Sequence, residues 1–149
     1  WSQLGIQMPE GADEIILIGR QSNSGTYHYF RETVLGKKRD FKLGSRDMHG
    51  SKDVVELVTK TPGAISYSGI GYAMPGARMV PVVLRPGTPP VAPSAETTLD
   101  GSYPIARPLF MYTLGHPQGP IKDYLDWILG EQGQAMLARS GYIPLPKRK

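Results

Sequence analysis

Cysteine is absent from the 149 residues of this sequence. Disulfide bridges and thiolate metal sites are therefore excluded, although the absence fits a reducing compartment and a disulfide-free exported protein equally well. Long apolar runs are also missing, since stretches such as Ile15 to Ile18 are far too short to span a bilayer. No segment resembles a signal peptide and the sequence starts at Trp1 rather than at methionine, so we expect a processed form or a fragment.

The sequence also has little excess of one charge sign, with 17 lysine and arginine residues against 13 aspartate and glutamate residues. The formal net charge is +4, and the basic residues are scattered except for clusters at Lys37 to Arg39 and at Lys147 to Lys149. Neither cluster is interleaved with aromatic residues as a nucleic-acid groove would be, so both are interpreted as solvated surface and no nucleic-acid partner is expected. The length and the 40% hydrophobic content suit one domain, which buries roughly two-thirds of its unfolded surface.

Several enzyme motifs are incomplete. Lys38 stands where a phosphate-binding loop needs serine or threonine, and the stretch from Gly69 to Met74 lacks the third glycine of a dinucleotide fingerprint. No serine is followed two positions later by glycine, so the nucleophile elbow is absent. The histidines are isolated and lack metal-ligand spacing: His28, His49 and His116. We therefore expect no metal, no cofactor and no catalytic residue.

Short apolar segments alternate with amphipathic ones along the chain, which is typical of an α/β fold. Strands are predicted at Glu14 to Ile18, Ala64 to Ser68, Met79 to Leu84 and Arg107 to Leu114. Helices are predicted from Ser24 to Leu35, ended by Gly36, then around Val54 to Val58, and around Ile121 to Ile128. The proline-rich stretch between residues 85 and 93 is interpreted as a stiff connection, and a polar loop is expected before Gly50.

The residues between the first strand and the first helix are mostly hydrogen-bond donors. Arg20 follows the strand, and Ser24, Gly25 and Thr26 open the helix. A serine N-cap accepts one amide near the first turn, while the amides of Gly25 and Thr26 lack intrahelical acceptors. The helix dipole adds positive charge, and arginine presents a planar fork to two oxygens of a tetrahedral anion. The pattern predicts a phosphate-like anion site, although ordinary helix capping and a surface salt bridge explain the same residues.

Several stretches resemble, in the same order, the periplasmic phosphate-binding proteins of ABC importers. They are Arg20 with Ser24-Gly25-Thr26, TPGAISYSGIGYA (61–73), YPIARPLFMYT (103–113) and GEQGQAMLARSGYIPLP (130–146). The first residues, Trp1 to Gly5, are similar to the tryptophan and Leu-Gly that precede the arginine in that family. Ser66 departs from the family's usual glycine, which we interpret as a tolerated strand substitution.

This resemblance implies one lobe, mostly the second, of a type II periplasmic binding protein-like fold, with a mixed sheet flanked by helices. Residues 1–102 would form the second lobe with the anion-binding helix start. Residues 103–149 would form the segment and the C-terminal helices that return toward the first lobe. The N-terminal lobe segment, which in this family brings a Gly-Ser-Thr-type loop and an aspartate to the anion, is expected to be absent.

The function that the resemblance implies is non-catalytic binding of inorganic phosphate for delivery to a membrane ABC permease. Arg20 would be the charged clamp, Ser24 a hydroxyl donor, and Gly25 and Thr26 amide donors. The localisation would be periplasmic or extracellular, with a membrane anchor through the absent N-terminus as one form.

Three alternatives stay open. The same donors would stabilise a transferring phosphoryl group in an enzyme acting on phosphate esters, although no convincing nucleophile or metal carboxylate accompanies Arg20. Another oxyanion, such as sulfate, tungstate or molybdate, would use the same donors. A protein-interaction fragment would replace the lost lobe by a partner or a second copy, and the apolar residues from Tyr103 onward make self-association an expectation.

Overall fold

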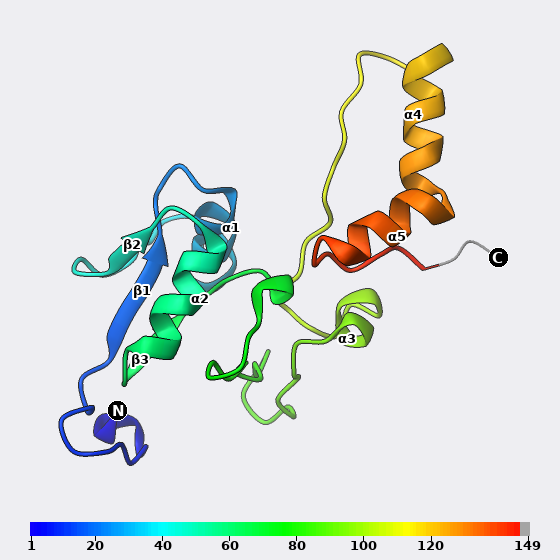
Figure 1. The fold of residues 1–149 in the computed structure, drawn as a ribbon. Coiled ribbons are helices and arrows are strands. Elements are labelled where there is room, and N and C mark those ends of the chain that lie inside the picture. Colours follow the sequence, from blue (N-terminus) through cyan, green and yellow to red (C-terminus); the bar gives the residue numbers. More distant parts are fainter. Residues whose placement is uncertain (147–149) are drawn as a thin grey trace. The chain divides into compact units, whose positions relative to one another are not determined.

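The computed structural model describes residues 1–146 and divides into two compact units, Trp1–Met79 and Val80–Lys149 (Figure 1). The basic tail that was predicted as solvated surface, Lys147 to Lys149, lies outside the described residues. The predicted division between a second lobe of residues 1–102 and a returning segment of residues 103–149 stays a prediction.

The first unit contains a three-stranded parallel sheet. Strand β1 (Ile16–Arg20) lies between β2 (Arg46–Met48) and β3 (Ala64–Ser66). In this register Ile18 is opposite Arg46 on one side and Ser66 on the other. Parallel neighbours need crossover connections, and helices α1 (Gly25–Leu35) and α2 (Ser51–Lys60) supply them. The predicted α/β class is confirmed.

Helix α1 begins and ends where local chemistry predicts. Its N-cap Ser24 has extended backbone angles, and its C-cap Gly36 has a φ of 79°, a left-handed value that favours glycine. The helix packs against β1, but none of its residues is fully buried, and Val34 is 48% exposed. The caps therefore fix where the helix begins and ends.

Helix α2 supplies the core of this unit. Val54 is fully buried and Val55 nearly so, and α2 packs against β1, whose Ile18 is only 2% exposed. Fully burying a side chain of this size stabilises the folded state by about 1.5–3 kcal/mol. The helix ends at Thr61, as the following Pro62 predicts. The core therefore anchors the strand that leads directly to Arg20.

The two helices cover opposite faces of the sheet. The chain moves from β1 outward to β2 through α1, and then back across β1 to β3 through α2 (Figure 1). Because parallel crossovers are right-handed, movement in opposite directions places the helices on opposite faces. The chain therefore leaves the carboxyl ends of β1 and β2 toward different faces of the sheet.

The regular secondary structure of the second unit consists of helices. It contains α3 (Ala95–Leu99), α4 (Gly119–Leu129) and α5 (Glu131–Arg139), and α4 confirms the helix predicted around Ile121 to Ile128. Two short 3-10 helices, η1 (Ser2–Leu4) and η2 (Ile70–Tyr72), belong to the first unit.

Two of the strand predictions made from the sequence are wrong. The segment from Met79 to Leu84 forms only an isolated antiparallel bridge between Val82 and Val91, and residues 107–114 form neither helix nor strand. A strand needs neighbours, and the described residues of this unit offer no sheet edge to pair with. The polar loop expected before Gly50 contains the unpredicted strand β2, because pairing with β1 overrides its polar composition.

Candidate functional site

Arg20 is the last residue of β1, at the carboxyl end of the sheet, and is held from two sides. Its backbone N–H donates to the Tyr67 hydroxyl at 3.3 Å, and its Nη1 donates to the Ser51 hydroxyl at 2.5 Å. Tyr67 follows β3, whereas Ser51 is the first residue of α2. The Nε atom is buried and has no hydrogen-bond partner in the structure. The guanidinium is thus anchored through one nitrogen and keeps further donors without a protein acceptor.

Ser24 follows Arg20 through a tight turn, closed by the bond from the Ser24 N–H to the Gln21 carbonyl at 2.9 Å. The side chain is nearly buried, with 8% exposure, and its Oγ accepts from the amides of Thr26 at 3.2 Å and Tyr27 at 3.4 Å. A hydroxyl that accepts two amides still has its own hydrogen to donate. Ser24 therefore caps the helix and remains a donor.

Gly25 and Thr26 differ in what their amides do. The Thr26 amide bonds to the cap, whereas the sequence predicted that it lacks an intrahelical acceptor. The reason is geometric, because an extended N-cap places its oxygen over the second and third amides of the helix. Within residues 1–146 the Gly25 amide has no acceptor. Gly25 is therefore the amide at this helix start with an unused hydrogen.

The charges at the two helix starts are different. Helix α1 has no acidic residue in its first turn, whereas α2 has Asp53, whose carboxylate accepts from the Gly50 amide at 3.1 Å. A carboxylate in the first turn already neutralises part of the positive end of the dipole. The start of α1 has no such group, so it favours an anion from outside the chain.

Sequence reasoning missed three residues that surround Arg20. They are Ser51, Tyr67 and Ser68, and the Ser68 hydroxyl donates to the Ser51 carbonyl at 3.1 Å. All three follow β2 or β3, so they reach β1 only through the parallel strand order. The available signal was the alternation of strands and helices, since the carboxyl ends of neighbouring parallel strands meet at one edge.

Asp47 lies against Gly19. A Cβ atom at Gly19 would lie 2.7 Å from the Asp47 Oδ1 atom, so a side chain there would require the carboxylate to move. The carboxylate is exposed and accepts from the Ser45 hydroxyl at 2.8 Å. Asp47 is thus a solvated surface carboxylate that is already hydrogen-bonded within the chain.

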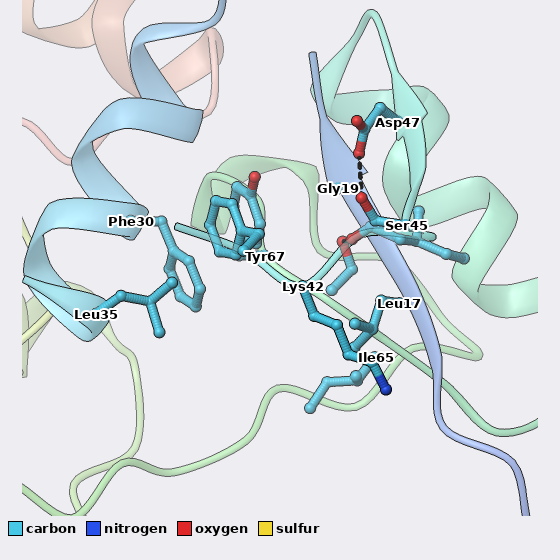
Figure 2. Close-up of a pocket in the computed structure, with 12 residues that line it drawn as sticks. Leu17, Gly19, Phe30, Leu35, Lys42, Ser45, Asp47, Ile65 and Tyr67 are labelled. Carbon is cyan, nitrogen blue, oxygen red and sulfur yellow. Dashed lines mark hydrogen bonds between the residues drawn. The ribbon is translucent and has the colours of Figure 1, made fainter. Parts of the chain in front are cut away.

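A pocket of about 270 Å³ lies on the same face of the sheet (Figure 2). Its lining includes Phe30, Phe41 and Tyr67, and the Phe30 and Tyr67 rings stack with centroids 4.2 Å apart. Burial raises the pKa of the Tyr67 phenol above its usual value, so this group keeps its proton near neutral pH. Arg20 and Ser24 do not line the pocket, and an apolar wall does not suit a bare anion.

The described residues contain neither a membrane-spanning helix nor a cluster of metal ligands. Between residues 1 and 146, no helix is both long and apolar enough to cross a membrane. In the same range, no group of three or more histidine, cysteine, aspartate or glutamate side chains is arranged to hold a metal ion.

Comparison with known proteins identifies the family. The model of a family described as "PBP superfamily domain" matches residues 1–132. A protein named phosphate-binding protein PstS from Pseudomonas aeruginosa is 34% identical over 99% of this chain and 47% of its own length. A protein of the same name from Bacillus subtilis is 30% identical over 100% of this chain and 46% of its own length. The chain spans about half the length of these curated relatives.

Solved structures agree on the fold. A possible phosphate binding protein from Planctomyces limnophilus superposes with a TM-score of 0.74 and 27% identity, over 98% of this chain and 53% of that one. A phosphate-binding protein of a phosphate ABC transporter from Streptococcus pneumoniae gives a TM-score of 0.73 at 23% identity, over 91% of this chain and 53% of that one. The resemblance found in the sequence is confirmed at the level of the family: the chain belongs to the PBP superfamily.

Proposed function

We propose that this chain binds inorganic phosphate without chemistry, as part of a protein that delivers phosphate to a membrane ABC permease. The observation that carries the proposal is the set of unused donors between the end of β1 and the start of α1: the Arg20 guanidinium, the Ser24 hydroxyl hydrogen and the Gly25 amide. Helix N-termini with an adjacent arginine favour tetrahedral anions, because every group present donates. Thr26 would add its side-chain hydroxyl, since its amide is used by the cap.

The names of the relatives support phosphate over other oxyanions. Those from Pseudomonas aeruginosa and Bacillus subtilis are called phosphate-binding proteins, and one solved structure is described as part of a phosphate ABC transporter. They are named as binding proteins rather than enzymes, which supports a non-catalytic role. We extend the same argument to location, and propose that the protein acts in the periplasm or outside the cell.

The decisive experiment is calorimetry of this chain and of its full-length parent with phosphate, sulfate, arsenate and tungstate. Hydrogen phosphate offers a proton that a buried carboxylate accepts, whereas sulfate near neutral pH offers none. The described donor cluster contains no such acceptor, since Asp47 is exposed and bonded to Ser45. We expect the chain alone to bind phosphate weakly and to discriminate poorly against sulfate. Submicromolar binding with exclusion of sulfate would contradict this, and heat from none of the four anions would refute the function.

Self-association of the chain is a separate proposal. In the second unit Leu109, Phe110 and Met111 are 60%, 70% and 55% exposed. Apolar side chains in one run at this exposure favour association with other apolar surface, of which a second copy is one source. Light scattering should show a mass above 16.3 kDa that falls on dilution. A strict monomer at high concentration that binds no hydrophobic dye would contradict it.

A further inference from the structure

The guanidinium of Arg20 makes one side-chain hydrogen bond in the described structure, and its partner is Ser51. The Nη1 atom donates to the Ser51 Oγ at 2.5 Å, and both side chains are partly buried. Arginine otherwise has many rotamers, so an unheld guanidinium would lose considerable conformational entropy when an anion binds. A single short bond to a fixed oxygen removes much of that freedom before the ligand arrives.

Ser51 is itself held in place. Its carbonyl accepts from the Ser68 hydroxyl at 3.1 Å, and it is the first residue of α2, whose Val54 is fully buried. Ser68 follows β3, so the hydroxyl that holds Arg20 is tied to the third strand as well as to the core. The Ser51 hydroxyl is therefore held in a fixed position relative to the sheet.

We propose that Ser51 is a positioning residue of the anion site, which aims the Arg20 guanidinium at the ligand without touching the ligand itself. This inference rests on the proposed function. Arginine has two usable edges, and Nη1 lies on the side of Cδ, whereas Nε and Nη2 share the opposite edge. Ser51 occupies Nη1 and leaves the Nε and Nη2 edge for two anion oxygens. Nε is buried in this structure and has no hydrogen-bond partner among the described residues, so it keeps its hydrogen to donate.

A different role for Ser51 makes different predictions. If Ser51 were a direct ligand, its removal would weaken binding whether or not Arg20 is present. If it were a structural residue of α2 alone, its removal would lower stability and leave the guanidinium unchanged. A double-mutant cycle separates a positioning residue from both, because two residues that act as one unit are not additive.

The test uses the full-length parent protein and inorganic phosphate, titrated by calorimetry. We expect Ser51→Ala to weaken binding about tenfold, similar to the loss of one hydrogen bond to a charged group. In the background of Arg20→Ala, the same change should weaken binding less than about twofold. Ser51→Thr keeps the hydroxyl and should recover most of the affinity. Ser140→Ala, which removes a hydroxyl bonded to the Met136 carbonyl in the second unit, is the matched control and should have no effect.

A second measurement does not depend on ligand. The NMR signals of the Arg20 guanidinium report rotation about its Nε–Cζ bond, and Ser51→Ala should speed that rotation while circular dichroism stays unchanged. Additive losses in the cycle, or no change in either measurement, would overturn the inference. The proposed function fails on a different result, namely an Arg20→Ala variant that binds phosphate as tightly as the parent. If Ser51→Ala fails to fold, the phosphate affinities of Ser51→Thr and Ser51→Gly are compared instead. A positioning role predicts that Ser51→Thr binds phosphate more tightly than Ser51→Gly, and equal affinities would overturn the inference.

Discussion

The two units of the chain differ in where their apolar side chains go. The buried apolar residues all lie in the first unit: Ala12, Ile18, Val54 and Val55. The second unit buries one residue, Gly133, between residues 80 and 146, and most of its large apolar side chains are exposed. The first unit has a sheet with helices on both faces, whereas the second has helices without a sheet to cover.

This difference indicates which unit can hold a site rigidly. Anion recognition needs donors fixed to within a fraction of an ångström, and a packed core provides such fixation. The donors of Arg20 and Ser24 sit directly after β1, the strand whose Ile18 packs in the core. The exposed apolar residues of the second unit instead favour contact with further protein.

The largest expected effect tests this contrast in packing. Ile18→Ala should lower the free energy of unfolding by about 2–5 kcal/mol, because it leaves a cavity beside Val54 and α2. Leu114→Ala in the second unit, where Leu114 is fully exposed, should change it by less than about 0.5 kcal/mol. Urea unfolding of both variants measures the difference. Equal losses would mean that the second unit has a core of its own.

The next effect concerns the proposed anion site of the first unit. Arg20→Ala should weaken phosphate binding by roughly 1.5–3 kcal/mol, about ten- to a hundredfold, since it removes a charge-assisted contact. Arg20→Lys should recover part of the loss, because an ammonium keeps the charge but not the planar fork. Arg85→Ala in the second unit removes the same charge and is the control. A similar loss from Arg85→Ala would indicate general electrostatics instead of a site at the start of α1.

Local chemistry predicted the first unit well. Ser24 and Gly36 marked the ends of α1 because an N-cap and a left-handed C-cap are properties of single residues. Strand β2 escaped prediction because a three-residue segment with two charged side chains becomes a strand only beside β1. The contacts of Arg20 with Ser51 and Tyr67 depend on strand order, which the periodicity of the sequence does not contain.

The second unit shows the opposite error. The apolar residues at 79–84 and 107–114 have the composition of strands, and the sequence predicted strands there. Composition reports only the tendency to pair, whereas a strand exists where a partner is present. The described residues of this unit bring no partner beyond the bridge between Val82 and Val91. The helix of Ile121 to Ile128 was predictable because a helix satisfies its own backbone.

A smaller effect separates capping from binding. Ser24 and Ser94 are both helix N-caps: the Ser24 hydroxyl accepts from the amides of Thr26 and Tyr27, and the Ser94 hydroxyl accepts from the amide of Thr97. Ser24→Ala and Ser94→Ala should each cost about 0.5–2 kcal/mol of stability, but only the first should also weaken phosphate binding. Ser24→Gly should cost a few tenths of a kcal/mol in stability and still lose affinity. Amide NMR during a phosphate titration should show the largest shifts near Gly25. Shifts at Lys37 to Arg39 would contradict the site.

The smallest effect is a response to acid in each unit. In the first unit the Phe41 amide and the Tyr27 hydroxyl, at 2.8 and 3.0 Å, hold the pKa of the Asp40 carboxyl below its usual value. In the second unit bonds from Ser102 lower the pKa of Asp100. A carboxyl with a lowered pKa in the folded state stabilises fully above its unfolded value of about 3.9. That stabilisation is lost as the pH falls through the lower folded value.

Because both carboxylates are exposed, each change should be small. Asp40→Asn should flatten the loss of stability between about pH 4 and the lower folded pKa in the first unit alone, since Tyr27 belongs to α1. Asp100→Asn should act only on the second unit, where its bond spans two residues. Hydrogen exchange resolved by residue, measured across this range of pH, assigns each effect to its unit. An effect of Asp40→Asn on the protection of α4 would show that the two units unfold together, and the contrast in packing would then not extend to stability.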